Sequence, residues 1–177
     1  MKSTHCTASF FWLLAALLAR LSAAGEGAAT IAAYQRLSVE VRTGAQPTSE
    51  ELEWLKGDGV TTVINLRQPG EHQAAEEAAK AKELDLRYFN VPVETASPKE
   101  EQADEFRRLL ADPQNRPVFI HCGSANRVGA FWMIHRVLDE GWKLEDAQTE
   151  AARIGLKSAN LRDFALDYIR RHQEEAE

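Results

Sequence analysis

The sequence predicts an α/β fold, with a mostly parallel central sheet flanked by helices and a C-terminal helical part. Two observations lead to this prediction. Between residues 39 and 121, short β-branched segments alternate with longer segments rich in alanine and glutamate, and such alternation is typical of a parallel sheet covered by helices on both faces. After residue 121 the chain has only helical patterns, which predicts a helical part behind the sheet.

The first part of the predicted fold contains two strands and one helix. Residues 39–43 form the first expected strand, which a Gly-Ala-Gln-Pro turn closes. Thr48 and Glu51 have the spacing of a capping box, which predicts a helix over 48–56. A Gly-Asp-Gly segment stops this helix, and the short β-branched run 60–66 predicts a buried strand.

The middle of the chain continues the alternation. After a Pro-Gly break, the alanine- and glutamate-rich segment 71–84 predicts a helix. Alternating residues over 86–93 predict the third strand. Ser97 as a cap and Pro98 at the first helical position predict the next helix, which extends to residue 110.

One more strand and three helices complete the predicted fold. A turn over 112–116 leads into the buried strand 117–121, and a loop of small residues follows over 122–126. The helices expected after this loop cover residues 128–139, 144–154 and 161–172. Three side chains of this part are expected to pack in the core, namely Trp132, Met133 and Trp142.

The N-terminal segment has the pattern of a secretory signal peptide. Lys2 gives a positive charge, residues 10–18 are apolar, and residues 22–24 are small enough for cleavage. An uncleaved anchor is the alternative, but the apolar run is shorter than the roughly 20 residues of a membrane span. We expect residues 1–24 to be a signal peptide, residues 25–177 to form a single domain, and the protein to be exported, either periplasmic or secreted.

The composition after cleavage limits the possible partners. Residues 1–24 carry two basic and no acidic side chains, so their removal changes the net charge from −6 to −8. An acidic chain without a Lys/Arg block is a poor match for nucleic acid, and no second apolar segment approaches the length of a membrane span. The histidines have no ligand spacing, so no metal or other cofactor is expected. The sequence predicts no oligomeric state.

Cysteine usage singles out one thiol. Cys6 leaves with the signal peptide, so Cys122 is the only cysteine of the mature chain. Oxidising compartments favour paired cysteines. A lone cysteine there is either inert and buried or a reactive thiol.

The surroundings of Cys122 favour a reactive thiol. Cys122 follows a buried strand, and a loop of small residues connects it to Arg127 at the start of a helix. The free N–H groups and positive dipole of a helix N-terminus bind a tetrahedral anion, and Arg127 adds a planar fork for two anion oxygens. The same field stabilises the thiolate, which is the nucleophilic form of cysteine. The alternative is a buried structural cysteine beside a surface arginine.

The segment 118–130 (Val-Phe-Ile-His-Cys-Gly-Ser-Ala-Asn-Arg-Val-Gly-Ala) resembles the phosphate loop of cysteine-dependent protein tyrosine and dual-specificity phosphatases. It is more similar to a bacterial branch of that superfamily, the dual-specificity-phosphatase-like domain also found fused to β-lactamase-like hydrolases. Three other stretches fit this branch: Gly-Ala-Gln-Pro at 44–47, Gly-Val-Thr-Thr-Val-Ile-Asn-Leu-Arg at 59–67 with Glu71 beyond, and Tyr-Phe-Asn-Val-Pro-Val at 88–93. The resemblance covers residues 36–170 and implies a protein-tyrosine-phosphatase-like fold.

The resemblance also implies a phosphoric monoester hydrolase with a two-step mechanism and no metal. Cys122 attacks the phosphorus of a phosphorylated protein or small molecule and forms a cysteinyl-phosphate, while a carboxylic acid protonates the leaving oxygen. Water then hydrolyses this intermediate with that carboxylate as the base, and Arg127 holds the phosphoryl oxygens throughout. The residues expected to bind the phosphate are Gly123, Ser124, Ala125, Asn126 and Arg127.

The loop departs from the superfamily pattern at two points. Four residues instead of five separate Cys122 from Arg127, which is typical of the bacterial branch and also matches the rhodaneses. Val128 replaces the usual Ser or Thr, whose hydroxyl helps the thiolate leave, so slow breakdown of the phosphoenzyme is expected. Two alternatives therefore stay open: a rhodanese-like sulfurtransferase that uses a Cys122 persulfide, and a catalytically weak phosphate- or phosphoprotein-binding module.

The general acid of the superfamily is normally an aspartate after the preceding strand, and residues 86–99 contain no aspartate. Glu94 is the only carboxylate directly after that strand, so we expect it to be the general acid. Asp104 is a poorer candidate because it lies on a predicted helix.

Two further residues are expected to support the site. His121 directly precedes the nucleophile, and the resemblance implies that it orders the loop by hydrogen bonding. Arg67 ends a strand at the sheet edge where ligands bind in open α/β sheets. It could contact the substrate anion, although pairing with Glu71 to hold the turn is the favoured role.

Overall fold

The computed structural model describes residues 30–71 and 74–175 and contains a five-stranded sheet in the order β1-β2-β5-β3-β4. The four strands β2, β5, β3 and β4 are parallel, and β1 pairs with β2 in the antiparallel direction. The predicted mostly parallel sheet is therefore confirmed. The strands are β1 (Gln35–Arg36), β2 (Val41–Gly44), β3 (Thr62–Asn65), β4 (Arg87–Asn90) and β5 (Val118–His121).

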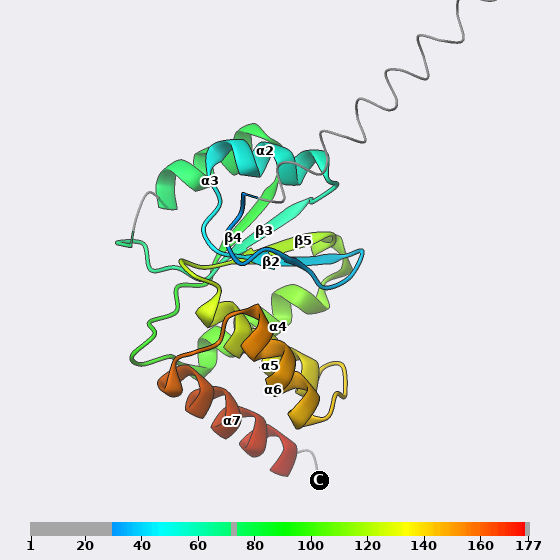
Figure 1. Cartoon of the computed structure of the whole chain (residues 1–177), viewed down its shortest axis with the longest axis vertical. Helices are drawn as coiled ribbons and strands as arrows, with labels where there is room; N and C mark the ends of the chain where they lie inside the picture. Colours follow the sequence, from blue (N-terminus) through cyan, green and yellow to red (C-terminus); the bar gives the residue numbers. More distant parts are fainter. Residues whose placement is uncertain (1–29, 72–73, 176–177) are drawn as a thin grey trace, which may run out of the picture.

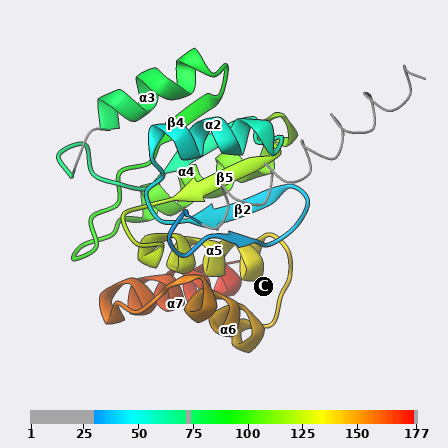
Figure 2. The same cartoon turned by 45° about the horizontal axis from the view of Figure 1, so that its top comes forward.

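Helices cover both faces of the sheet (Figure 1). The helices α2 and α3 lie on one face, and the remaining four lie on the other, where α5 is packed between the sheet and the pair α6 and α7 (Figure 2). The helices are α2 (Ser49–Gly57), α3 (Ala74–Glu83), α4 (Glu100–Ala111), α5 (Asn126–Leu138), α6 (Leu144–Ile154) and α7 (Ala159–Glu174), with a short 3-10 turn η1 (Pro113–Asn115) before β5.

The side chains of β5 alternate between two hydrophobic cores. Val118 and Ile120 belong to the larger core, which contains the apolar side of α5, whereas Phe119 belongs to the smaller core under α2 and α3. Successive side chains of a strand point to opposite faces, so His121 lies on the same face as Phe119. Its ring stacks on the Phe119 ring with 5.5 Å between centroids. The last residue of β5 therefore faces α3.

A glycine allows α5 to approach α6 closely. A Cβ on Gly129 would lie 2.7 Å from the carbonyl oxygen of Ala151 and 2.9 Å from Cβ of Leu156. Real Cβ atoms do not come this close, so a larger residue would push the two helices apart. Because Gly129 lies two residues after Arg127, this packing fixes the helix start that carries the arginine.

Several element boundaries and one core residue differ from the sequence prediction. The helix expected at Ser97 begins at Glu100, because the Ser97 hydroxyl donates to Glu94. The helix expected from residue 71 is described from Ala74. Trp142 is 37% exposed and its ring lies against the Arg136 guanidinium, so its prediction as a core residue is wrong, whereas Trp132 and Met133 are buried as predicted.

The predicted signal peptide, residues 1–24, lies outside the described residues. Within residues 30–71 and 74–175, no helix is long and apolar enough to cross a membrane.

Candidate active site

The nucleophile candidate lies at the carboxyl edge of the sheet. In the sheet register, His121 is flanked by Gly44 of β2 on one side and by Asn65 of β3 on the other. Cys122 is the next residue, so it lies where three parallel strands end. Its thiol is free and fully buried in the structure. Ligands of open α/β sheets bind at this edge.

The loop after Cys122 is held from behind by the turn between α6 and α7. Ala125 has the left-handed conformation, with φ 62°, and is the N-cap residue of α5 without a side-chain cap. The side-chain oxygen of Asn126 accepts hydrogen bonds from the backbone N–H groups of Lys157 (2.9 Å) and Ser158 (3.1 Å). The side-chain oxygen of Asn126 therefore anchors the loop, which leaves the backbone N–H and the side-chain amide N–H groups as donors for the predicted phosphate contact. Gly123 and Ser124 lie exposed on the open side.

Arg127 is held by a carboxylate from the other side of the site. Its Nη1 and Nη2 atoms donate to the two carboxylate oxygens of Glu71 at 2.5 and 2.7 Å, and Nη1 also donates to the carbonyl oxygen of Val93 at 3.0 Å. Three of the five guanidinium N–H groups are used in this way. The other two, on Nε and Nη2, donate to no oxygen within the described residues. A Cβ on Gly123 would lie 3.5 Å from Nη2 of Arg127, so the Nη2 side of the guanidinium lies against the loop.

The charged forms of Arg127 and Glu71 stabilise each other. Burial opposes the charged form of Arg127, but the hydrogen bond to Glu71 and the negative charges of Cys122 and Glu71 outweigh it and raise the arginine pKa. In turn, the hydrogen bond from Arg127 lowers the pKa of the Glu71 carboxyl. Arg127 is therefore a permanent cation between the thiol and Glu71.

Arg67 belongs to the turn that carries Glu71. Its Nη2 atom donates to the backbone carbonyl oxygen of Glu71 at 2.6 Å, and its Nη1 atom donates to the side-chain oxygen of Gln46. The backbone N–H of Gln68 also donates to the Glu71 carboxylate, at 2.9 Å. These contacts place Arg67 in the support of the turn that carries Glu71.

His121 has a carboxylate partner that the sequence did not predict. Its Nε2 atom lies 2.6 Å from Oε1 of Glu77 on α3, and both side chains are buried. The other oxygen of Glu77 accepts from Gln46 at 2.8 Å and from Asn65 at 3.4 Å. Nothing in the alanine- and glutamate-rich pattern of α3 distinguishes Glu77 from its neighbours, because only the sheet register brings His121 under this helix.

Glu94 directly follows a residue that contacts Arg127. It follows Val93, whose carbonyl oxygen accepts from Arg127. Glu94 is exposed, and its carboxylate accepts from the Ser97 hydroxyl at 2.8 Å. Asp104, by contrast, lies on α4 and accepts from the Tyr168 hydroxyl. Of the two carboxylates considered as general acid, Glu94 is the one on a loop that contacts Arg127.

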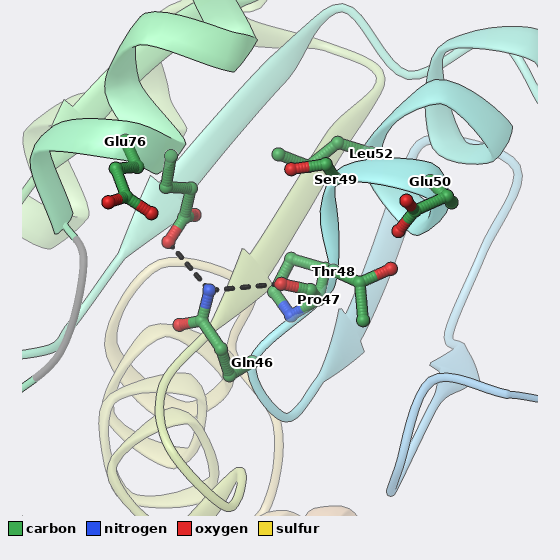
Figure 3. Close-up of a pocket in the computed structure, with 8 residues that line it drawn as sticks. Gln46, Pro47, Thr48, Ser49, Glu50, Leu52 and Glu76 are labelled. Atoms are coloured by element: carbon green, nitrogen blue, oxygen red, sulfur yellow. Dashed lines mark hydrogen bonds between the residues drawn. The ribbon is translucent and has the colours of Figure 1, made fainter.

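A pocket of about 440 Å³ lies beside the start of α2 and is lined by Gln46, Glu76 and Glu77 among others (Figure 3). Cys122 and Arg127 do not line it, so it adjoins the supporting residues Gln46 and Glu77 rather than the thiol. Within the described part of the chain, no three metal-ligating side chains gather in one place.

The family comparison matches most of the chain. The family described as "DSP-PTPase phosphatase fused to NAD+ Kinase" matches residues 17–165. A curated rice protein (Oryza sativa subsp. japonica) named Probable NAD kinase 2, chloroplastic, is 30% identical over 91 residues, which is 48% of this chain and 9% of the rice protein. The chain thus spans about a tenth of that relative's length.

Solved structures show the same fold. A candidate phosphatase from Shewanella putrefaciens CN-32 has a TM-score of 0.69 at 20% identity, with 82% of this chain and 97% of that chain covered. The core catalytic domain of the PP-IP phosphatase SIW14 from S. cerevisiae has a TM-score of 0.67 at 17% identity, with coverages of 82% and 94%. At these identities the likeness concerns the fold alone, which carries the loop, the sheet edge and the C-terminal helices described above.

Proposed function

The chain belongs to the DSP-PTPase family of phosphatases described as fused to NAD+ kinase, and on that premise we propose that it hydrolyses a phosphomonoester through a cysteinyl-phosphate intermediate. The observation that supports this most strongly is the pair of Cys122 and Arg127 at the sheet edge. Cys122 directly follows β5, and two N–H groups of the Arg127 guanidinium lie on the side that faces the loop. One phosphoryl group fits between these two groups and the backbone N–H groups at the start of α5.

In the first step, the Cys122 thiolate attacks phosphorus and forms the S–P bond as the bond from phosphorus to the leaving oxygen breaks. Glu94 in its protonated form gives its proton to that oxygen. In the second step, Glu94 removes a proton from water, the water oxygen attacks phosphorus, and the thiolate leaves with inorganic phosphate as product. Arg127 holds the phosphoryl oxygens in both steps, where charge builds up in the transition state.

Glu71 has a separate role in this mechanism. It binds the far edge of the Arg127 fork through two hydrogen bonds, and the low pKa of its carboxyl keeps it ionised. An ionised carboxylate is a poor proton donor, so Glu71 orients the arginine and Glu94 supplies the acid. This division of roles follows the general rule that neighbouring carboxylates serve different functions in different environments.

Val128 determines which step limits turnover. Its side chain is fully buried in the larger core, so no hydroxyl from this position reaches the leaving sulfur. We propose that breakdown of the phosphoenzyme is slower than its formation. Family membership gives the sulfurtransferase and binding-only alternatives no support.

Export is also a proposal, which rests on the signal-peptide pattern of residues 1–24. N-terminal sequencing of the protein recovered from a bacterial periplasm tests it. A mature chain that begins at Gly25 supports export with cleavage after Ala24, whereas recovery only from the cytoplasm with Met1 present contradicts it.

Hydrolysis of para-nitrophenyl phosphate tests the proposed activity. Residues 25–177 and the Cys122→Ser variant are assayed under reducing conditions from pH 5 to pH 8. The wild-type protein is expected to release para-nitrophenol, and the variant to lose this activity although it melts at the same temperature. A folded wild-type protein that hydrolyses neither this substrate nor a phosphotyrosine peptide would contradict the proposal.

A further inference from the structure

We propose that Glu77 is a positioning residue of this active site, which holds His121 with a proton on Nε2 and so fixes the strand end that carries Cys122. The inference rests on the proposed phosphatase function. Glu77 lies on α3, outside the loop after Cys122 and outside the segment that carries Glu94.

Burial of the Glu77 carboxylate is unfavourable unless donors or positive charges contact its oxygens. Only 4% of its side chain is exposed, and transfer of an ionised carboxylate out of water is unfavourable without partners. The Gln46 amide at 2.8 Å and the Asn65 amide at 3.4 Å donate to one of its oxygens, and the Nε2 atom of His121 lies 2.6 Å from the other oxygen, Oε1, at ion-pair distance. Burial raises the pKa of the Glu77 carboxyl, but the hydrogen bond and charge of His121 outweigh this effect and lower it.

An ionised carboxylate fixes the state of the histidine. A carboxylate only accepts hydrogen bonds, so the short contact requires a hydrogen on Nε2 of His121. The plane of the ring is held by stacking on Phe119 at an interplanar angle of 10°. Glu77 and Phe119 therefore fix both the orientation and the tautomer of the residue bonded directly to Cys122.

The same carboxylate is connected to the arginine. Gln46 donates to Glu77 through its amide N–H and accepts from Arg67 through its amide oxygen. Arg67 donates to the backbone of Glu71, and Glu71 holds the Arg127 fork. The residue before the nucleophile and the phosphate-binding arginine thus belong to one continuous set of polar contacts on the α3 side of the sheet.

Among the residues that the structure describes, Glu77 is the only ionised group in contact with the ring. Asn65 donates to the Tyr88 hydroxyl at 2.8 Å, and burial together with the charge of Glu77 raises the pKa of Tyr88 to about 12, so this phenol stays neutral. The positive charge of Arg67 lies beyond Gln46 and contributes to the low pKa of Glu77. Loss of the Glu77 charge would therefore act on His121 directly.

The test compares Glu77→Gln with Glu76→Gln in the 25–177 protein. Both changes replace a carboxylate by an amide of equal size on adjacent residues of α3, but Glu76 is exposed and Glu77 is buried.

An amide at position 77 can donate to the His121 ring and favour the opposite tautomer. We expect Glu77→Gln to lower kcat for para-nitrophenyl phosphate and the rate of Cys122 alkylation by iodoacetamide by about 10- to 100-fold. KM is expected to change little, because alignment of the nucleophile matters in the transition state. Glu76→Gln is expected to match the wild type.

Nitrogen-15 NMR of the His121 ring gives a readout that a purely structural role of Glu77 would not change. In the wild-type protein the proposal requires a protonated Nε2 that exchanges slowly with water, and in Glu77→Gln the Nε2 signal must shift.

A wild-type ring that carries its only proton on Nδ1 would overturn the proposal without any variant, even if Glu77→Gln does not fold. Wild-type kcat and alkylation rate in a folded Glu77→Gln would also overturn it. An inactive wild-type protein would contradict the phosphatase function instead, and the NMR and alkylation results would still decide the role of Glu77.

Discussion

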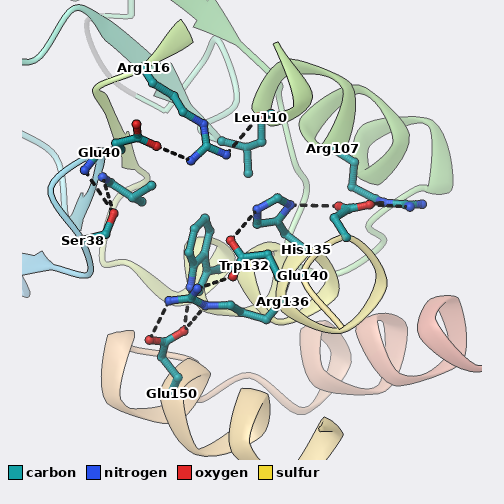
Figure 4. A network of polar contacts seen from close by, with 12 residues as sticks. Ser38, Glu40, Arg107, Leu110, Arg116, Trp132, His135, Arg136, Glu140 and Glu150 are labelled. Atoms are coloured by element: carbon teal, nitrogen blue, oxygen red, sulfur yellow. Dashed lines mark hydrogen bonds and ion pairs between the residues drawn. The ribbon is translucent and has the colours of Figure 1, made fainter. Parts of the chain in front are cut away.

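The two ends of α5 lie in two polar networks that contain the same kinds of contact in different parts of the fold. The loop network consists of Gln46, Arg67, Glu71, Glu77, His121 and Arg127. The helix network consists of Arg107, Trp132, His135, Arg136, Asp139, Glu140 and Glu150 (Figure 4). Each contains a buried histidine against a carboxylate and an arginine that holds a carboxylate with two hydrogen bonds.

The helix network connects helices to one another. Glu150 of α6 accepts from the Trp132 indole at 2.8 Å and from Arg136 at 2.7 Å, both on α5. Asp139 at the end of α5 accepts from His135 at 2.9 Å and from Arg107 of α4 at 2.7 Å. None of these residues follows the carboxyl end of a strand. The helix network therefore stabilises the packing of the helices against one another.

The loop network instead connects segments that follow strand ends. Gln46 comes after β2, Arg67 and Glu71 come after β3, and His121 ends β5. Because parallel strands bring these ends to one edge, the network surrounds Cys122. The comparison indicates that position at the sheet edge, rather than the type of pair, makes a buried ion pair functional. Substitutions in the loop network should therefore change activity, and substitutions in the helix network should change stability.

The largest effect is expected from Arg127→Lys. An ammonium group cannot hold two phosphoryl oxygens and Glu71 in one plane, and loss of such a donor typically lowers the rate by about 10²- to 10³-fold. Steady-state kinetics with para-nitrophenyl phosphate measure kcat/KM. Arg136→Lys is the matched control at the other end of α5, and it should leave kcat/KM unchanged. Equal losses in the two variants would remove the distinction between the networks.

Glu150→Gln should give the largest stability effect in the helix network. The side chain is 8% exposed, and its neutralisation weakens the charge-assisted hydrogen bonds from Arg136 while Arg136 keeps its pair with Glu140, at a cost of about 1.5 kcal/mol. Urea denaturation at pH 7 measures the free energy of unfolding. We expect kcat per folded molecule to stay at the wild-type value, and a loss of kcat larger than the loss of folded protein would show that α6 acts on the site.

Acid should weaken the helix network in a defined pH range. Burial raises the pKa of Asp139, but hydrogen bonds from His135 and Arg107 outweigh it and lower the pKa from 3.8 to about 2. A carboxyl whose pKa is lower in the folded state stabilises the fold above its unfolded pKa, and this contribution is lost as the pH falls through the folded pKa. Because the Asp139 side chain is 28% exposed and solvent screens its pairs, it should contribute about 1 kcal/mol at pH 7, which is lost between pH 4 and pH 2.

Denaturation of Asp139→Asn from pH 7 to pH 2 measures this contribution. The variant should be less stable than the wild type at neutral pH, and the two curves should converge toward pH 2. Parallel curves over this range would contradict the role of the Asp139 charge. The kcat of the variant at pH 7 should equal that of the wild type, since Asp139 lies at the far end of α5.

Most of the fold and the core of the candidate site could be predicted because their signals are local. The capping box of Thr48 and Glu51 is present in the structure with both of its hydrogen bonds, and the boundaries expected for α6 agree with those observed. Cys122 and Arg127 stand in one short segment between a strand and a helix, so the chain itself brings them together.

The supporting groups could not be predicted because they depend on tertiary structure. The Glu71–Arg127 pair joins residues 56 positions apart, and Glu77 contacts His121 only because α3 packs over the end of β5. The two-residue strand β1 is too short to give a periodic signal. Trp142 has an apolar side chain, but it follows the end of α5, where Arg136 covers one face of its ring and solvent reaches the rest.

The most direct test of the account is detection of the phosphoenzyme. Residues 25–177 are mixed with para-nitrophenyl phosphate, quenched in acid, digested and analysed by mass spectrometry, with Cys122→Ser in parallel. The account predicts a burst of para-nitrophenol equal to the enzyme concentration, because Val128 slows the second step, together with one phosphoryl group on the Cys122 peptide. Turnover without phosphoryl on that peptide, or activity that persists in Cys122→Ser, would contradict it.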